Sequence, residues 1–198
     1  MIPGIDVSHW QGSIDWQRVK VAGVRFAYLK ATQGATLGDP RLETNYEGAI
    51  QAGIPVGLYH VFIANAGNEQ IDNWLKASKA FPCQLPAWLD IEPGAVTDDT
   101  VHQAIAFLGM CFQPSDCVYC SPSTAQVVLT DPVFQTYKLA IAHYTGAPSP
   151  NTVLWSDWLF WQHSAVGKVD GIETAAVDLD WFHGSEEDFQ SLILAKVT

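Results

Sequence analysis

Residues 86–94 read Pro-Ala-Trp-Leu-Asp-Ile-Glu-Pro-Gly, an apolar run that ends in two carboxylates and a turn. A short apolar run of this kind is typical of a buried strand, which Pro93-Gly94 cannot continue. Successive side chains of a strand point to opposite faces, so Asp90 and Glu92 share a face while Ile91 faces the other way. The stretch therefore predicts a strand end with two carboxylates side by side, their Cα atoms roughly 6.5–7 Å apart.

Similar apolar runs alternate with helical patterns along the rest of the chain. Eight stretches are predicted as strands: 5–7, 24–31, 55–62, 86–91, 117–121, 138–142, 153–162 and 172–179. Helical patterns cover 13–22, 41–52, 68–80 and 100–111, and a last helix opens at 185–188. Strands that alternate with helices indicate parallel β-α units, and about eight of them favour a closed barrel over an open sheet.

The predicted fold class is therefore α/β, with a single irregular (β/α) TIM-like barrel of about eight strands. Such barrels usually need about 250 residues, whereas this chain has 198. Some helices must then be short or missing, and the weak helical pattern of 130–165 places this irregularity in the C-terminal half. Because no repeat, linker or low-complexity segment interrupts the sequence, we expect one domain over residues 1–198.

The composition narrows the possible partners. The formal net charge is −11, and the sequence has no cluster of Lys and Arg that could displace counterions from phosphates, so nucleic acid and anionic membranes are poor candidates. The sequence contains no stretch of about 18 consecutive apolar residues, so we do not expect it to insert into a membrane. Met1-Ile2 leads directly into Pro3-Gly4 without a basic start or an apolar segment, so we expect either synthesis in the cytoplasm without a signal peptide or a signal that was removed from this chain.

The four cysteines, Cys83, Cys111, Cys117 and Cys120, include a formal C-x-x-C pair. A zinc site would want a second such pair or suitably spaced histidines, and neither is evident. Cys117 and Cys120 lie in a predicted strand, where positions i and i+3 face opposite ways. We interpret the cysteines as buried thiols and leave open one disulfide that involves Cys111.

Several polar side chains fall near predicted strand ends, and active sites of (β/α) barrels form at the C-terminal ends of the strands. They are Asp6, Tyr59, Asp90, Glu92, Tyr119, Tyr144 and Asp178. Two close carboxylates cannot both ionise freely, and a protonated acid beside an ionised one is the equipment of glycoside hydrolysis. The alternative for Asp90 and Glu92 is a capped loop without catalytic function.

Five segments, in order, carry a resemblance to a known family. They are Gly4-Ile5-Asp6-Val7-Ser8-His9-Trp10-Gln11-Gly12, Phe26-Ala27-Tyr28-Leu29-Lys30-Ala31-Thr32-Gln33-Gly34, Gly57-Leu58-Tyr59-His60, Leu89-Asp90-Ile91-Glu92, and a C-terminal part made of Phe160-Trp161-Gln162-His163 and of Gly171-Ile172 through Val177-Asp178-Leu179-Asp180-Trp181-Phe182. Over essentially its whole length the chain resembles glycoside hydrolase family 25, the Chalaropsis-type lysozymes. The family often has Asn where Asp180 stands.

The resemblance implies a single catalytic domain with a flattened barrel and an acidic groove. It implies hydrolysis of the β-1,4 bond between N-acetylmuramic acid and N-acetylglucosamine, with bacterial cell-wall peptidoglycan as the partner and no metal or organic cofactor. We expect a monomeric phage endolysin or bacterial autolysin that acts on the wall after release or export.

The roles follow from this resemblance. Glu92 is the expected general acid. Asp90 is expected to stay ionised and orient the 2-acetamido group of the substrate, whose oxygen would be the internal nucleophile; alternatively, a carboxylate activates water with inversion. Asp6 and Asp178 would enrich the negative field that stabilises an oxocarbenium-like transition state. The expected substrate contacts are Tyr59, Tyr119, Tyr144, Trp10, Trp161 and Gln162. Structural roles are expected for Asp180, Trp16, Trp74, Trp88, His60 and His143.

Two other classes of function stay open. One is a catalytically silent wall-binding module, although a binder has no need of clustered, mutually repelling carboxylates. The other is a metal-dependent hydrolase such as a polysaccharide deacetylase, although no HExxH motif or comparable ligand set is present.

Overall fold

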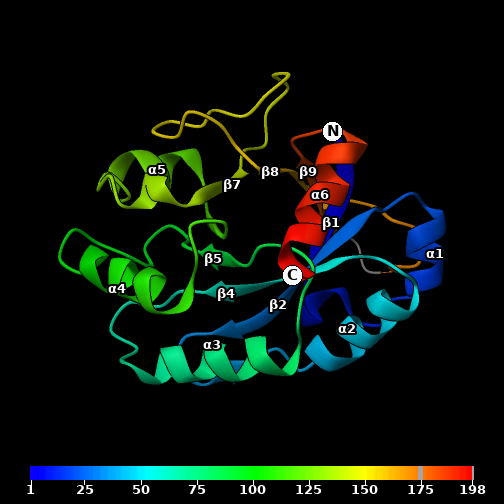
Figure 1. Ribbon diagram of the computed structural model, residues 1–198, viewed down its shortest axis with the longest axis horizontal. Coiled ribbons are helices and arrows are strands. Elements are labelled where there is room, and N and C mark those ends of the chain that lie inside the picture. Colours follow the sequence, from blue (N-terminus) through cyan, green and yellow to red (C-terminus); the bar gives the residue numbers. More distant parts are fainter. Residues whose placement is uncertain (174–175, 198) are drawn as a thin grey trace.

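The computed structural model describes residues 1–173 and 176–197, and it confirms a closed barrel (Figure 1). The barrel order is β1-β9-β8-β7-β6-β5-β4-β2, and β1 also pairs with β2 to close it. The strands are β1 (Ile2–Val7), β2 (Phe26–Gln33), β4 (Val56–Val61), β5 (Trp88–Asp90), β6 (Cys117–Cys120), β7 (Lys138–Ala142), β8 (Phe160–Gly167) and β9 (Val177–Phe182). A short extra strand, β3 (Leu37–Gly38), lies antiparallel beside β2.

The last barrel strand departs from the predicted parallel arrangement. All neighbouring pairs from β1 through β2 and on to β8 are parallel, but β9 runs antiparallel to both β8 and β1. Nine residues, 168–176, connect β8 to β9, and so short a connection joins antiparallel neighbours, whereas a parallel pair needs a longer crossover. The expectation of parallel β-α units throughout is therefore wrong for this strand.

The last two strands also begin later than predicted. Strand β8 starts at Phe160 rather than 153, and β9 starts at Val177 rather than 172. Residues 143–159 form a long loop that carries the buried Trp155 and Trp158, and the Trp155 indole donates a hydrogen bond to the Tyr137 carbonyl at 3.1 Å. Buried aromatic residues in this loop resemble a strand in sequence, which explains the error.

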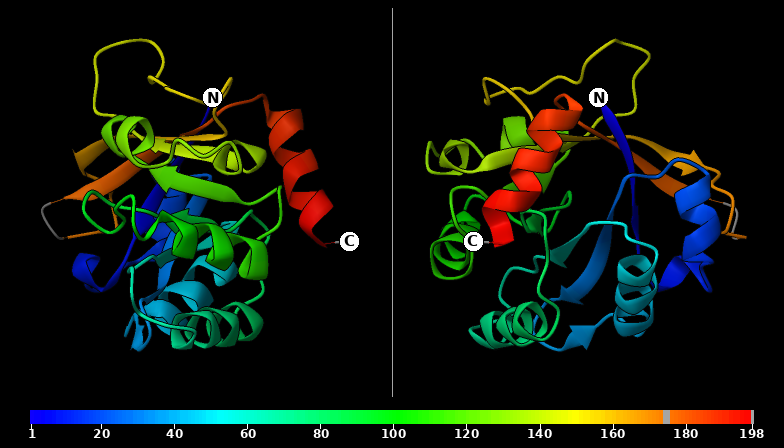
Figure 2. Two further views of the ribbon diagram at one scale, coloured as in Figure 1. Left: turned by 90° about the vertical axis from the view of Figure 1, so that its left-hand side faces the viewer. Right: turned by 45° about the vertical axis from the view of Figure 1, so that its right-hand side comes forward.

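The five predicted helices are confirmed, and their bounds agree with the prediction to within a few residues. They are α1 (Trp16–Val21), α2 (Leu42–Gln51), α3 (Glu69–Ala80), α4 (Val101–Cys111) and α6 (Glu186–Val197), with short 3-10 turns at His9–Gln11 and Phe134–Thr136. A further helix, α5 (Pro122–Val127), was not predicted, although its Ser121 N-cap followed by a proline is a common start signal. Helices cover the outside of the barrel, while the loop between β7 and β8 extends from it without one (Figure 2).

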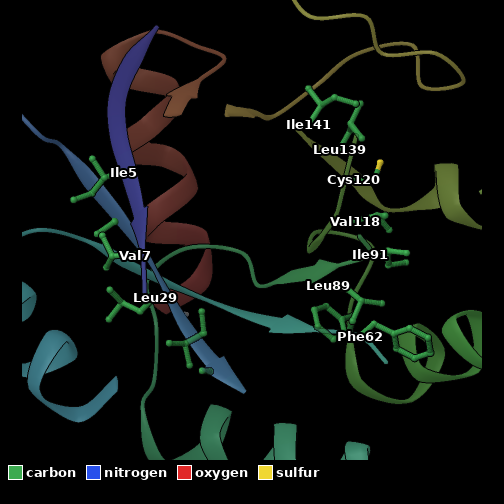
Figure 3. Packing of buried hydrophobic residues seen from close by; sticks show 14 of the residues in the cluster. Ile5, Val7, Leu29, Phe62, Leu89, Ile91, Val118, Cys120, Leu139 and Ile141 are labelled. Carbon is green, nitrogen blue, oxygen red and sulfur yellow. The ribbon is translucent and has the colours of Figure 1, made fainter. Parts of the chain in front are cut away.

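The barrel wall separates two apolar layers because side chains alternate along each strand. Figure 3 shows part of the outer layer, with Ile5, Leu29, Leu89 and Val118 on β1, β2, β5 and β6. The inner layer is Ile2, Phe26, Tyr28, Leu85, Trp88, Cys117, Ala140, Phe160, Phe182 and Phe189. Phe189 of α6 contacts Phe26 and Phe182, so α6 closes the end of the barrel where the parallel strands begin.

The inner apolar layer fills only part of the barrel. Trp88 stacks on Tyr28 with ring centroids 3.5 Å apart, and Gly57 leaves room for the Tyr28 ring because a Cβ there would lie 2.2 Å from it. Above Trp88 the inner face is polar. Cys117 belongs to the inner layer and Cys120 to the outer one, so the two face opposite ways as predicted. In the described part of the chain, no helix has the length and apolar character needed to cross a membrane.

Candidate active site

A groove opens at the C-terminal ends of the parallel strands, where the sequence predicted it. One pocket of about 170 Å³ is lined by Asp6, Tyr59, Trp88, Asp90, Glu92, Tyr119, Tyr144, Gln162 and Asp178. An adjoining pocket of about 200 Å³ shares five of these residues and adds Val7, Ser8, Trp10, Gln11, Lys30 and Val61. We call these two pockets together the groove. It contains nine of the ten residues proposed from the sequence for catalysis or substrate contact.

Asp90 and Glu92 both line the groove, as the alternation of a strand requires. Strand β5 ends at Asp90, but its pairing continues, because the Ile91 amide donates to the Tyr119 carbonyl at 2.9 Å. Asp90 is buried, whereas Glu92 is exposed. One carboxylate therefore lies in the barrel and the other reaches solvent within the same groove.

The surroundings of Asp90 favour its neutral form. Burial raises the pKa of Asp90 well above its usual value, Glu92 and Asp6 raise it further, and the Lys30 ammonium lowers it. Among the described residues, nothing donates a hydrogen bond to its Oδ1 atom. Burial in the barrel interior therefore disfavours the charged form of Asp90, which the expected role of this residue requires.

Asp6 and Asp178 form a second pair of acids. They are register partners on β1 and β9, the neighbouring first and last strands of the barrel. Burial raises the pKa of Asp178 to about 6. The pKa of Asp6 is raised well above its usual value by burial and by Asp178, while a hydrogen bond from Gln162 lowers it. Ionisation of Asp178 therefore makes ionisation of the buried Asp6 less favourable.

Gln162 connects this pair to two tyrosines. Its Nε2 donates to Asp6 Oδ2 at 2.6 Å, and its Oε1 accepts from the Tyr119 hydroxyl at 2.9 Å and from the Tyr144 hydroxyl at 2.5 Å. Burial is the largest cause that raises the pKa of both phenols, to about 12 for Tyr144. Both hydroxyls consequently stay protonated at neutral pH and act as donors here.

Trp10 forms an exposed aromatic rim of the groove. It is 75% exposed and lies on the 3-10 turn after β1. A capping box holds this turn, because the Ser8 hydroxyl accepts from the Trp10 amide at 3.3 Å and the Ser8 amide donates to Gln11 Oε1 at 2.9 Å. The His9 ring lies 2.8 Å from Asp39, which anchors the same turn to the segment after β3.

Trp161 is the predicted substrate contact that the structure places elsewhere. It is buried in the outer apolar layer, and its indole donates to the His143 carbonyl at 2.8 Å. Alternation along β8 accounts for this, since Gln162 faces the groove and its neighbour must face outward. The prediction that Trp161 contacts sugar is therefore corrected to a structural role. Trp88, expected in the core, both packs there and forms the floor of the groove.

Sequence reasoning missed three polar residues of the groove, although signals for them exist. Lys30 lies two positions after the inward-facing Tyr28 on β2, so alternation alone places it inside. Ser8 and Gln11 carry the S-x-x-Q spacing of a capping box at a strand end. Lys30 matters most, because among the described residues that line the groove it is the one Lys or Arg side chain.

Asp180 lies on the inner face of β9, in register with Gly4 of β1 and Gln162 of β8. It is 1% exposed, and among the described residues neither carboxylate oxygen has a hydrogen-bond partner. Burial raises the pKa of Asp180 well above its usual value, with further contributions from Asp6 and Asp178. It is a buried acid below the groove.

His60 and His143, which the sequence analysis expected to have structural roles, both make polar contacts within the protein. The buried His60 ring lies 2.6 Å from the Thr32 hydroxyl and 3.0 Å from Gln70 Oε1, and burial lowers the pKa of His60 to about 4. His143 Nδ1 accepts from the Asn151 amide at 3.0 Å. Within the described residues, no group of three or more His, Cys, Asp or Glu side chains is arranged to hold a metal ion.

Comparison with known proteins identifies the family. The model of the glycosyl hydrolases family 25 matches residues 5–172. The chain belongs to this family. Lysozyme M1 of Streptomyces globisporus is 34% identical over 207 residues, which cover 93% of this chain and 68% of that protein. An N,O-diacetylmuramidase of Arthroderma benhamiae is 23% identical and aligns over 96% of this chain and 85% of its own length.

The fold agrees with a solved structure of the same family. The crystal structure of a bacterial lysozyme from Streptomyces coelicolor superposes with a TM-score of 0.83 and 31% sequence identity, and the match covers 98% of each chain. The barrel fold is thus shared with a solved lysozyme.

Proposed function

We propose that this family 25 glycosyl hydrolase is a peptidoglycan muramidase, a lysozyme that hydrolyses the β-1,4 bond between N-acetylmuramic acid and N-acetylglucosamine. The observation that carries the proposal is the placement of Asp90 and Glu92 in one groove, the first buried and the second exposed. Two carboxyl groups in unlike environments are the arrangement from which glycosidases obtain an acid and a second, assisting carboxylate. The names of the family relatives support the same activity.

Glu92 is the proposed general acid. Its exposed side chain projects beyond Asp90 at the end of β5, so it can meet a glycosidic oxygen that enters the groove from solvent. Proton donation to this leaving oxygen assists cleavage of the bond to the muramic acid residue. Asp6 and Asp178 lie across the groove from β5 and supply the negative field for the developing positive charge on the sugar.

Asp90 is proposed to act as an ionised carboxylate after the substrate binds. In one version it accepts a hydrogen bond from the 2-acetamido N–H and orients the acetamido oxygen for attack; in the other it takes a proton from an attacking water. Both versions require Asp90 to lose the proton that its burial favours in the empty groove. The ionisation of Asp90 should therefore limit activity on the acid side.

Peptidoglycan is the proposed partner, and the exposed rings of Trp10 and Tyr144 are proposed contacts for its sugars. Tyr59 and Tyr119 line the same groove and complete the proposed substrate contacts, while Gln162 lines it with both of its polar atoms already hydrogen-bonded. We propose that residues 1–198 act as one catalytic domain and as a monomer, with no requirement for a cofactor.

The test is digestion of purified peptidoglycan, followed by borohydride reduction and mass spectrometry of the fragments. We expect reduced muramitol ends from the wild type and none from Glu92→Gln, while Glu47→Gln, at an exposed position of α2, should match the wild type. Reduced glucosaminitol ends would mean that the enzyme is a glycosidase that cleaves the other glycosidic bond of the glycan strand. The absence of new reducing ends with the wild type would contradict the proposal and favour a silent binder or a deacetylase.

A further inference from the structure

Gln162 is buried on the inner face of β8, where it lines the groove. Its amide oxygen accepts from two phenols and its amide nitrogen donates to one carboxylate oxygen, all at 2.9 Å or less. The side chain is therefore held at both polar atoms by three different parts of the chain: β6, the 143–159 loop and β1. A residue engaged in this way is poorly placed to serve mainly as a sugar ligand.

The two phenols determine which way the amide points. Each hydroxyl has a single proton, and because burial raises the pKa of both phenols these protons stay in place at neutral pH. With both protons directed at Oε1, the two lone pairs of this oxygen are used and the NH₂ group must face Asp6. The reverse orientation would bring the amide oxygen against a carboxylate oxygen, which would then have to carry a proton itself.

We propose, on the basis of the muramidase function above, that Gln162 is a positioning residue: held by Tyr119 and Tyr144, it keeps Asp6 Oδ2 as a hydrogen-bond acceptor and favours the ionised form of Asp6. Asp6 then presents a defined oxygen, in a fixed place, to the positive charge that develops on the sugar. Gln162 acts through Asp6 rather than on the substrate.

Tyr144 connects this arrangement to the outside of the molecule. Its side chain belongs to the loop between β7 and β8 and is 58% exposed, yet its hydroxyl bonds to the buried amide. A sugar that packs on the Tyr144 ring would therefore lie two hydrogen bonds from Asp6. This chain of contacts couples the position of the loop to the geometry of a buried acid.

The consequence for pH dependence has a definite sign. The hydrogen bond from Gln162 lowers the pKa of Asp6, so its removal should raise that pKa. Because the proposed reaction needs Asp6 ionised as well as Asp90, the acid limb of the activity profile should then move to higher pH. The titratable and charged groups around Asp6, from every strand that packs against it, are Lys30, Tyr59, Asp90, Glu92, Tyr119, Tyr144, Asp178 and Asp180. Gln162→Leu changes none of these groups, so a shift of the acid limb in that variant is caused by the loss of the Gln162 amide.

The experiment compares Gln162→Leu with the wild type in kcat and KM on soluble peptidoglycan fragments across pH. We expect kcat to fall roughly 10- to 100-fold, KM to change by less than about 3-fold because the substrate contacts remain, and the acid limb of kcat/KM to move to higher pH. Gln190→Leu, at an exposed position of α6, is the matched control and should leave all three unchanged.

Two milder variants keep the proposal testable if Gln162→Leu does not fold. Tyr119→Phe and Tyr144→Phe each remove one donor, and the amide keeps its orientation with the other. We expect each to have a small effect and the double variant to lower kcat by more than the product of the two single effects, with the same direction of pH shift. Restoring either tyrosine in the double variant should recover most of the activity.

An unchanged pH profile and unchanged kcat in a folded Gln162→Leu protein would overturn the positioning role. A loss of kcat without any shift of the acid limb would also overturn it, because a purely structural residue would give that result. A wild type that releases no muramitol ends would contradict the proposed function instead. The two failures are thus distinguished by the activity of the wild type.

Discussion

Asp6 and Asp178 are register partners at the point where the barrel closes, one on β1 and the other on the antiparallel β9. The pairing of the first barrel strand with the last brings these positions, 172 residues apart in the chain, to the same height in one groove. Burial disfavours the ionised form of Asp178, and this sets the first expectation for stability.

Asp178→Asn should stabilise the protein at neutral pH and have little effect at acid pH. The pKa of Asp178 is raised to about 6 in the folded protein, so its contribution to stability is fully present below the unfolded value of about 4 and is lost as the pH rises through about 6. Because Asp178 is partly exposed, we expect a gain on the order of 1 kcal/mol at pH 7. Urea unfolding at pH 4 and pH 7 measures it, and an equal effect at both pH values would contradict the expectation.

Lys30→Met should move the acid limb of activity to higher pH. The ammonium of Lys30 lowers the pKa of Asp90, and the proposed mechanism needs Asp90 ionised. Without the ammonium, Asp90 holds its proton to a higher pH, and activity measured below that point falls. The observable is kcat/KM on peptidoglycan fragments as a function of pH. Lys79→Met, at an exposed position of α3, is the control, and identical acid limbs for both variants would refute the role of Lys30.

Asp180→Asn should stabilise the protein as the pH rises. Asp180 is buried, its pKa is raised well above the usual value, and both its oxygens lack a hydrogen-bond partner among the described residues. Its contribution is present below the unfolded pKa of about 4 and is lost as the pH rises towards the folded value. An amide of the same shape has no charge to bury, so we expect a gain of about 1 kcal/mol or more at pH 8.

The comparison that decides this prediction is the free energy of unfolding of wild type and Asp180→Asn at pH 4 and pH 8. The difference between the two proteins should grow with pH. A constant difference would mean that Asp180 is already charged or already neutral over the whole range. Muramidase activity of the variant serves as a check that the groove above Asp180 is intact.

Local patterns in the sequence were enough to locate the acids of the groove. Alternation placed Asp90 and Glu92 on one face, and the requirement for closure placed Asp6 beside Asp178; both are confirmed. The same alternation, applied to β2 and β8, would have placed Lys30 inside and Trp161 outside. Both positions follow from strand alternation and need no knowledge of tertiary contacts.

Other features depend on tertiary surroundings and could not be read from local patterns. The late starts of β8 and β9 follow from a loop whose buried tryptophans resemble a strand. The raised pKa of Asp90 follows from how deeply the barrel buries it. The sequence shows that Asp90 and Glu92 are neighbours, but it does not show which of the two is buried. The assignment of ionisation within the pair therefore required the fold.

Trp10 and Trp161 provide a paired test of which tryptophan meets the substrate. Trp10 is 75% exposed on the rim, so Trp10→Ala should leave stability within about 0.5 kcal/mol of wild type. Loss of a stacking ring worth about 0.5–1.5 kcal/mol should raise KM roughly 2- to 10-fold.

Trp161 is 4% exposed and its indole is hydrogen-bonded, so Trp161→Ala should lower stability by about 3–5 kcal/mol. At a temperature where both variants are folded, KM should rise for Trp10→Ala alone. A larger rise for Trp161→Ala would mean that the outer face of β8 takes part in binding.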